Sequence, residues 1–198
     1  MAQQHDRVSQ WRNMNGQHFL TPNAYEDINE NSLVMDLGFY RGEFSKKFSC
    51  KVLAYEGSPS IYNEYGGNAQ SNTILKPYGL SSSDKTVLIS KNRDSSSAFN
   101  VNKNNAEDMK LVDVVQEFTD ESIEKVDFMK INIEGGEYEL LDRMIESGII
   151  TKVNRMMIQF HKEHEREITR DMITKRLEET HNRYINVDYV WEGWKLKS

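Results

Sequence analysis

Two acidic residues and a pair of glycines early in the chain have the types and spacing of a nucleotide-cofactor site. Asp36 follows a short apolar run and precedes Gly38 and Gly42, and a second apolar run ends at Glu56. In a β–α–β unit the glycines permit a tight turn close to the ligand, and an acid about 20 residues further on accepts hydrogen bonds from ribose hydroxyls. The expected cofactor-binding residues are Asp36, Gly38, Tyr40, Gly42, Glu56 and Gly57.

The spacing of the glycines narrows the choice of cofactor. The pattern D-x-G-x-x-x-G at 36–42 lacks the third glycine of G-x-G-x-x-G, which holds a pyrophosphate at a helix N-terminus. A cofactor that has a ribose but no diphosphate fits this turn better, and S-adenosylmethionine is the common one. A nicotinamide-dependent oxidoreductase is the alternative that the missing glycine disfavours.

Polar residues at the ends of two later apolar stretches are the candidates for catalysis. Glu134 follows the stretch 126–133, and His161 follows the stretch 153–160. The carboxyl ends of parallel strands face one ligand crevice, so we expect His161 as a general base and Glu134 to orient it or the acceptor. Lys130 lies inside the first stretch and needs a partner, either as electrostatic support in the site or in an ion pair with Asp127 or Glu134.

A metal site has weaker support. His161 and His164 form an H-x-x-H pair beside Glu163 and Glu165, but this spacing has no third ligand, which disfavours zinc. His164 is expected at the surface. We predict no metal-binding residue, although a divalent metal is possible.

Short apolar runs alternate with stretches of helical period from residue 33 onward, which predicts an α/β fold with a mostly parallel sheet and helices on both faces. Glu192-Gly193 is typical of a tight hairpin between two closing strands, which makes the end of the sheet antiparallel. Residues 1–32 are expected to form an N-terminal arm, and 33–198 the domain. The other expected elements are strands at 52–56, 73–76, 86–90, 126–133, 153–160, 184–191 and 194–197, helices at 43–49, 107–118, 137–147 and 163–180, and a long surface loop at 91–107.

The composition limits the class of protein. Of 198 residues, 37% are hydrophobic and 28% are charged, which is typical of one soluble globular domain. The net charge is -6 and the basic residues are interspersed with acids, so we expect no nucleic-acid partner. No apolar run approaches the roughly 20 residues of a membrane span, and the single Cys50 with no apolar leader predicts a cytoplasmic location. The sequence carries no signal for an oligomeric state.

Four stretches in this order resemble the FkbM family of S-adenosylmethionine-dependent methyltransferases: 36–45, 53–59, 127–137 and 159–161. The element K-I-x-x-E-G-x-E at 130–137 is the most specific of them. The resemblance implies a Rossmann-like methyltransferase fold with a seven-stranded sheet, and methyl transfer to a hydroxyl of a sugar, a glycan or a glycosylated small molecule. It also implies that Asp36, Gly38 and Gly42 hold the methionine part of the cofactor, that Glu56 holds its ribose, and that Lys130, Glu134 and His161 line the acceptor side.

Three positions depart from the pattern of this family. Tyr40 stands where asparagine is common, Asn132 where aspartate is usual, and Gln159 where glutamate is more frequent. An asparagine ligates through oxygen but brings no charge, so Asn132 makes a magnesium site less secure. Asn132 and Gln159 also keep open the alternative of a cofactor-binding module that has the fold without catalysis.

Overall fold

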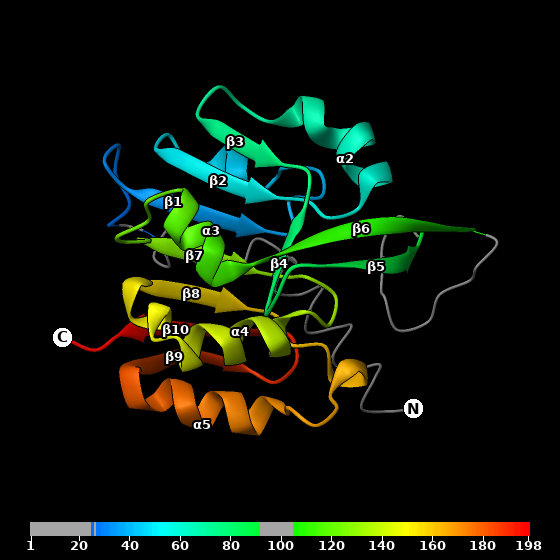
Figure 1. Cartoon of the computed structure of the whole chain (residues 1–198). Helices are drawn as coiled ribbons and strands as arrows, with labels where there is room; N and C mark the ends of the chain where they lie inside the picture. Colours follow the sequence, from blue (N-terminus) through cyan, green and yellow to red (C-terminus); the bar gives the residue numbers. More distant parts are fainter. Residues whose placement is uncertain (1–24, 26, 92–104) are drawn as a thin grey trace.

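A computed structural model describes residues 25, 27–91 and 105–198, and it is built around a seven-stranded sheet (Figure 1). One strand, the second from one edge of the sheet, runs antiparallel to both of its neighbours, and the other strands are parallel to one another. This confirms the predicted fold class. The spatial order of the strands is β3 (Thr73–Lys76), β2 (Lys51–Tyr55), β1 (Leu33–Leu37), β7 (Phe128–Ile131), β8 (Arg155–Ile158), β10 (Trp191–Leu196) and β9 (His181–Val187).

The four central strands end level with one another. Leu37 of β1 lies opposite Tyr55 of β2 and Ile131 of β7, and Ile131 lies opposite Ile158 of β8. Strands β1, β7 and β8 are almost wholly buried, as expected where a parallel sheet is covered on both faces. Their carboxyl ends form one edge, toward which the arrowheads point on the right of Figure 1.

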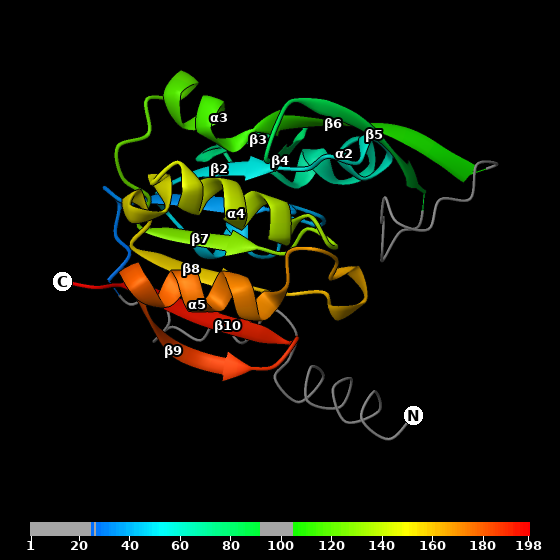
Figure 2. The same cartoon turned by 60° about the horizontal axis from the view of Figure 1, so that its bottom comes forward.

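Three helices cover one face of the sheet (Figure 2). They are α3 (Val114–Asp120), α4 (Glu137–Glu146) and α5 (Arg170–Thr180), and each packs apolar side chains into the larger core cluster. The other face is covered by an aromatic cluster of Phe39, Phe44 and Phe48 near the short helix η3 (Ser45–Lys47). No helix that the structure describes has the length and apolar character needed to cross a bilayer.

A second, three-stranded sheet stands beside the carboxyl edge. It consists of β4 (Gly79–Ser81), β6 (Ala106–Asp113) and β5 (Lys85–Ser90), and β5 and β6 form an antiparallel ribbon that extends past the main sheet (Figure 1). The predicted helix over 107–118 is therefore wrong in its first half. Asp113 caps α3 by accepting a hydrogen bond from the backbone N–H of Val115, so the helix begins only at Val114.

The closing antiparallel pair is present, but its turn is not where the sequence predicts it. The chain reverses between Val187 and Trp191, and Glu192 and Gly193 lie inside β10. A Cβ on Gly193 would lie 2.7 Å from the Tyr184 ring of β9, so this glycine serves the close pairing of the two strands. A glycine that permits close approach has the same local signature as a turn glycine.

Other boundaries also differ. The predicted helix over 163–180 is a short turn, η7 (Lys162–His164), followed by α5, which begins after the capping residue Thr169. Helix α2 (Pro59–Tyr65) was not expected; Ser58 caps it. The short helices η4 (Gly66–Asn68) and η6 (Ile149–Lys152) complete the fold. Most of the predicted arm 1–32 and of the predicted loop 91–107 lies outside the described residues.

Candidate active site

The turn after β1 is wedged between the ends of β2 and β7. Gly38 has φ 89°, and a Cβ at this position would lie 2.1 Å from the backbone oxygen of Asn132. The N–H groups of Gly38 and Phe39 both donate to the carbonyl oxygen of Tyr55, at 3.0 and 3.1 Å. Only glycine fits this position, so the first glycine of the sequence pattern allows the turn to pack closely against the ends of the neighbouring strands.

A buried ion pair lies beneath this turn. The side chains of Asp36 and Lys130 are both fully buried, with Lys130 Nζ 2.9 Å from Asp36 Oδ1 and 2.6 Å from the carbonyl oxygen of Gly38. Ser45 Oγ donates to the second carboxylate oxygen at 2.7 Å. The ion pair expected of Lys130 is present, but its partner is Asp36, whereas Asp127 pairs with Lys125.

This burial corrects two expected roles. Because Lys130 has no exposed surface, it does not line the acceptor side. Asp36 is equally inaccessible, so its carboxylate does not reach the methionine part of a cofactor directly. Both side chains instead hold the Gly38 turn from below, through the hydrogen bond to its carbonyl oxygen.

Glu56 connects the turn after β1 with the start of α2. Its carboxylate accepts hydrogen bonds from the backbone N–H of Tyr40 and of Ser58, both at 3.0 Å. Burial raises the pKa of Glu56, and these two hydrogen bonds oppose the rise. Each oxygen of a carboxylate accepts more than one hydrogen bond, so the Glu56 carboxylate has capacity for a further donor such as a ribose hydroxyl.

Tyr40 adopts a left-handed backbone conformation, with φ 49°. Asparagine adopts this conformation more readily than tyrosine, which fits the residue that is common here in the family the sequence resembles. The Tyr40 ring packs edge-on against Tyr65 at 5.5 Å between centroids, and the Arg41 guanidinium lies 5.0 Å from the centre of the Tyr40 ring. These contacts hold the side chain beside the turn.

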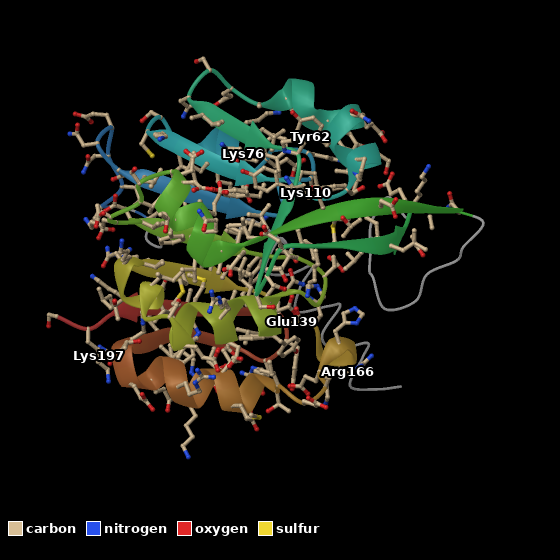
Figure 3. All side chains as sticks on the ribbon, viewed as in Figure 1. Tyr62, Lys76, Lys110, Glu139, Arg166 and Lys197 are labelled. Atoms are coloured by element: carbon tan, nitrogen blue, oxygen red, sulfur yellow. The ribbon has the colours of Figure 1, made fainter. Side chains whose placement is uncertain are left out.

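The ribbon of the second sheet closes the site on the β2 side. Glu107 of β6 accepts hydrogen bonds from Ser58 Oγ at 2.6 Å and Ser60 Oγ at 2.7 Å, and a Cβ on Gly57 would lie 2.5 Å from Met109 Sδ. The labels of Tyr62 and Lys110 in Figure 3 mark α2 and β6, the two elements on this side of the site. Glu107 and Met109 were not expected at the site, because the sequence pattern predicted a helix or loop here and the residues lie in a strand.

The ends of β7 and β8 bring one histidine between two carboxylates. His161 Nε2 lies 3.5 Å from Glu134 Oε1, and His161 Nδ1 lies 3.0 Å from Glu137 Oε1. Glu137 is fully buried, whereas the Glu134 side chain is 32% exposed and is the member of the cluster that solvent reaches. Glu134 and His161 were predicted to meet; Glu137 was missed as a site residue although it lies in the same motif.

The charge of His161 follows from its two partners. A carboxylate faces each ring nitrogen, an arrangement that favours the imidazolium, in which both nitrogens donate. Burial alone would lower the pKa of His161, but the hydrogen bonds with Glu134 and Glu137 raise it to about 10. A ring that carries both protons has no lone pair for another, so this geometry disfavours the predicted role of His161 as the general base.

This pKa predicts a pH-dependent contribution to stability. Since the pKa of His161 lies above its unfolded value, the stabilisation is complete below about pH 6.5 and is lost as the pH rises toward 10. We expect the difference in free energy of unfolding between wild type and His161→Gln to shrink steadily over that interval. Urea denaturation of both proteins at several pH values measures it, and a constant difference would contradict the assignment.

His164 lies against the loop between β7 and α4. A Cβ on Gly135 would lie 2.6 Å from its ring, and the ring centroid is 6.2 Å from that of His161. His164 is therefore partly buried, with its Nδ1 atom inaccessible, rather than fully at the surface as predicted. Within the described ranges, no group of three or more histidine, cysteine, aspartate or glutamate side chains is arranged to hold a metal ion.

Asn132 supplies a polar atom that the fold leaves unused. Its side-chain oxygen is buried and has no hydrogen-bond partner among the described residues, directly after β7 and beside the Gly38 turn. A buried acceptor without a partner is costly, so it points to a donor beyond the described residues, such as a bound ligand. The Asn132 side-chain oxygen and the Glu56 carboxylate could therefore both accept hydrogen bonds from the donor groups of a bound nucleoside cofactor.

The chain is similar to known proteins in both sequence and fold. Residues 36–184 match the model of the family described as "Methyltransferase FkbM domain". No curated protein sequence matches the chain. Among solved structures, the N-methyltransferase NodS from Bradyrhizobium japonicum is similar, with 9% identity, a TM-score of 0.53, and coverage of 93% of this chain and 96% of NodS.

The protein WbdD is similar as well. WbdD with the kinase inhibitor LY294002 is 11% identical with a TM-score of 0.56, covering 93% of this chain and 41% of WbdD. The structure described as the bifunctional kinase-methyltransferase WbdD has a TM-score of 0.55. The chain thus spans about two-fifths of the length of WbdD, and these likenesses show a shared Rossmann-like methyltransferase fold. Because the family model covers most of the chain, this protein belongs to the methyltransferase FkbM domain family.

Proposed function

We propose that this protein is an S-adenosylmethionine-dependent O-methyltransferase that acts on a hydroxyl of a sugar, a glycan or a glycosylated small molecule. The observation that carries the proposal is the juxtaposition of the Gly38 turn and the Glu56 carboxylate at the carboxyl ends of β1 and β2. Family membership supports methyl transfer. When bound, S-adenosylmethionine supplies an electrophilic methyl group on a sulfonium.

The cofactor side consists of the turn and the loop after β2. Gly38 and Gly42 bring the backbone close to the ligand, Tyr40 and Gly57 flank it, and Glu56 accepts hydrogen bonds from the ribose hydroxyls. Asp36 acts from beneath, through Lys130 and the carbonyl oxygen of Gly38.

The acceptor side consists of Glu134 and His161. Alignment of a hydroxyl beside a reactive carbon contributes about 7–11 kcal/mol to lowering a barrier, and a positioned proton acceptor contributes a further ~10²–10⁴-fold in rate. Glu134 is an accessible carboxylate at the ends of β7 and β8. The sugar class of the acceptor rests on the family resemblance. We also propose a cytoplasmic location, which rests on the single, buried Cys50.

The alternative is a module that binds the cofactor without catalysis. It is favoured by Asn132, which brings no charge to the end of β7, and by the two carboxylates that raise the pKa of His161. A protein of this kind binds S-adenosylmethionine but never consumes it with any acceptor.

Calorimetric titration with S-adenosylhomocysteine tests the proposal, with NAD titrated in parallel. We expect S-adenosylhomocysteine to bind and NAD not to bind. Glu56→Ala should weaken binding by about tenfold, roughly 1.4 kcal/mol, because the ribose hydroxyls lose their acceptor.

The matched control is Glu124→Ala, which removes a carboxylate whose side chain is 87% exposed and should leave the affinity unchanged. Thermal unfolding of each variant separates lost binding from lost folding, because Glu56 also holds two backbone N–H groups. A folded wild-type protein that binds NAD instead, or neither ligand, contradicts the proposal.

A further inference from the structure

Glu137 is a buried carboxylate that ties the end of β8 to the start of α4. Its Oε2 accepts from the backbone N–H of Gly135 at 2.9 Å, and its Oε1 accepts from the backbone N–H of His161 at 2.7 Å. The same Oε1 lies 3.0 Å from His161 Nδ1. A carboxylate can be buried away from water only where hydrogen-bond donors of the protein take the place of water. Glu137 also lies in the first turn of α4, where the positive end of the helix dipole stabilises its negative charge.

The His161 ring is held in one orientation by these contacts. Glu137 binds the backbone N–H, Tyr138 Oη donates to the carbonyl oxygen at 3.0 Å, and the ring is about nine-tenths buried. The groups that face the ring are Glu134, Glu137 and the ring of His164. With Nδ1 directed to Glu137, only Nε2 is left, and it lies toward Glu134.

We propose that Glu137 is a positioning residue that keeps His161 as an imidazolium with its Nε2–H directed at Glu134, and that Glu134 takes up the proton of the acceptor hydroxyl. The second half of this inference rests on the proposed function. As the hydroxyl oxygen bonds to the methyl carbon, the bond from that carbon to sulfur breaks, its electron pair stays on sulfur, and the hydroxyl proton passes to Glu134. From there the proton reaches water, because Glu134 is partly exposed.

The charges of the cluster suit this division of roles. Two carboxylates and one imidazolium carry one net negative charge, and protonation of Glu134 neutralises it. Glu137 cannot take the proton from a substrate because it has no exposed surface. The pKa of His161, which the hydrogen bonds with Glu134 and Glu137 raise to about 10 against the effect of burial, keeps the ring charged throughout the neutral range.

The test is a titration of the histidine ring signals by nuclear magnetic resonance, with His161 assigned from His161→Gln. In the wild-type protein we expect His161 to titrate near pH 10 and, in Glu137→Gln, more than one pH unit lower. His181 is the internal control: burial lowers its pKa, its Nε2 lies 2.9 Å from the Val153 carbonyl oxygen, and it should not respond to the substitution. If wild-type His161 titrates below pH 7, the positioning role is overturned, even if Glu137→Gln does not fold.

Turnover measurements test the proton acceptor once a methyl acceptor is in hand. Glu134→Gln should lower kcat by ~10²–10⁴-fold with KM nearly unchanged. Glu137→Gln should lower kcat less, and Glu139→Gln, an exposed carboxylate on the same helix, should leave it unchanged. A wild-type kcat that rises through about pH 6.5 would indicate a histidine base and contradict the role of Glu134.

The two proposals fail in different ways. S-adenosylhomocysteine affinity should stay within about twofold of wild type in Glu134→Gln and Glu137→Gln. If the wild-type protein does not bind it, the proposed function fails, but the histidine titration still decides the role of Glu137.

Discussion

Lys130→Met is expected to lower the free energy of unfolding by about 3–5 kcal/mol, because it leaves the Asp36 carboxylate buried without its counter-charge. Both side chains are fully buried, and Lys130 also donates to the carbonyl oxygen of Gly38 at 2.6 Å. The substitution therefore removes one charge and leaves two acceptors without their donor. Urea denaturation followed by circular dichroism measures the loss.

Two further proteins make the measurement decisive. Lys125→Met removes a lysine that is 67% exposed and paired with Asp127, so it should cost less than about 1 kcal/mol. The double variant Asp36→Leu with Lys130→Met should recover much of the loss, since no unpaired charge remains. If Lys130→Met costs no more than Lys125→Met, the buried pair does not support the turn as described.

Gly38→Ala is expected to have the second large effect, on both stability and cofactor binding. An alanine at φ 89° is strained by about 1–2 kcal/mol, and its Cβ would lie 2.1 Å from the backbone oxygen of Asn132. Because backbone atoms cannot rotate away, the turn has to lift from the end of β7. We expect a loss of stability beyond the strain alone, and affinity for S-adenosylhomocysteine at least about tenfold weaker, measured by calorimetry.

Gly148→Ala is the matched control for this variant. Gly148 has φ 77°, but a Cβ there meets nothing within 4 Å, so its substitution introduces the strain without the collision. Gly148 follows the C-terminal end of α4, which is remote from the site, so the affinity for S-adenosylhomocysteine should not change. Equal losses of stability in the two variants, with unchanged affinity in both, would contradict the role of the Gly38 turn.

The sequence determined the elements of the main sheet and the positions at its carboxyl edge. Apolar runs that end in a polar residue or a glycine are a local signal, and they identified the strands that precede Gly38, Glu56, Glu134 and His161. Parallel topology then required these ends to meet at one edge. The need of Lys130 for a partner also followed from the sequence, because an unpaired buried ammonium is too costly.

The pairing of the charged groups in the site depends on contacts between distant parts of the chain. Asp36 and Lys130 are 94 residues apart, and Glu137 and His161 are 24 apart, so no local pattern reports either contact. The charge of His161 depends on both carboxylates at once, and only one of them, Glu134, was predicted to lie beside it. Likewise, residues 106–111 form a strand because they pair with β5, and Gly193 lies in a strand because β10 pairs with β8 and β9. Periodicity in the sequence shows which face of a segment is apolar. It does not show which distant segment covers that face, and the charge and shape of the site depend on that partner.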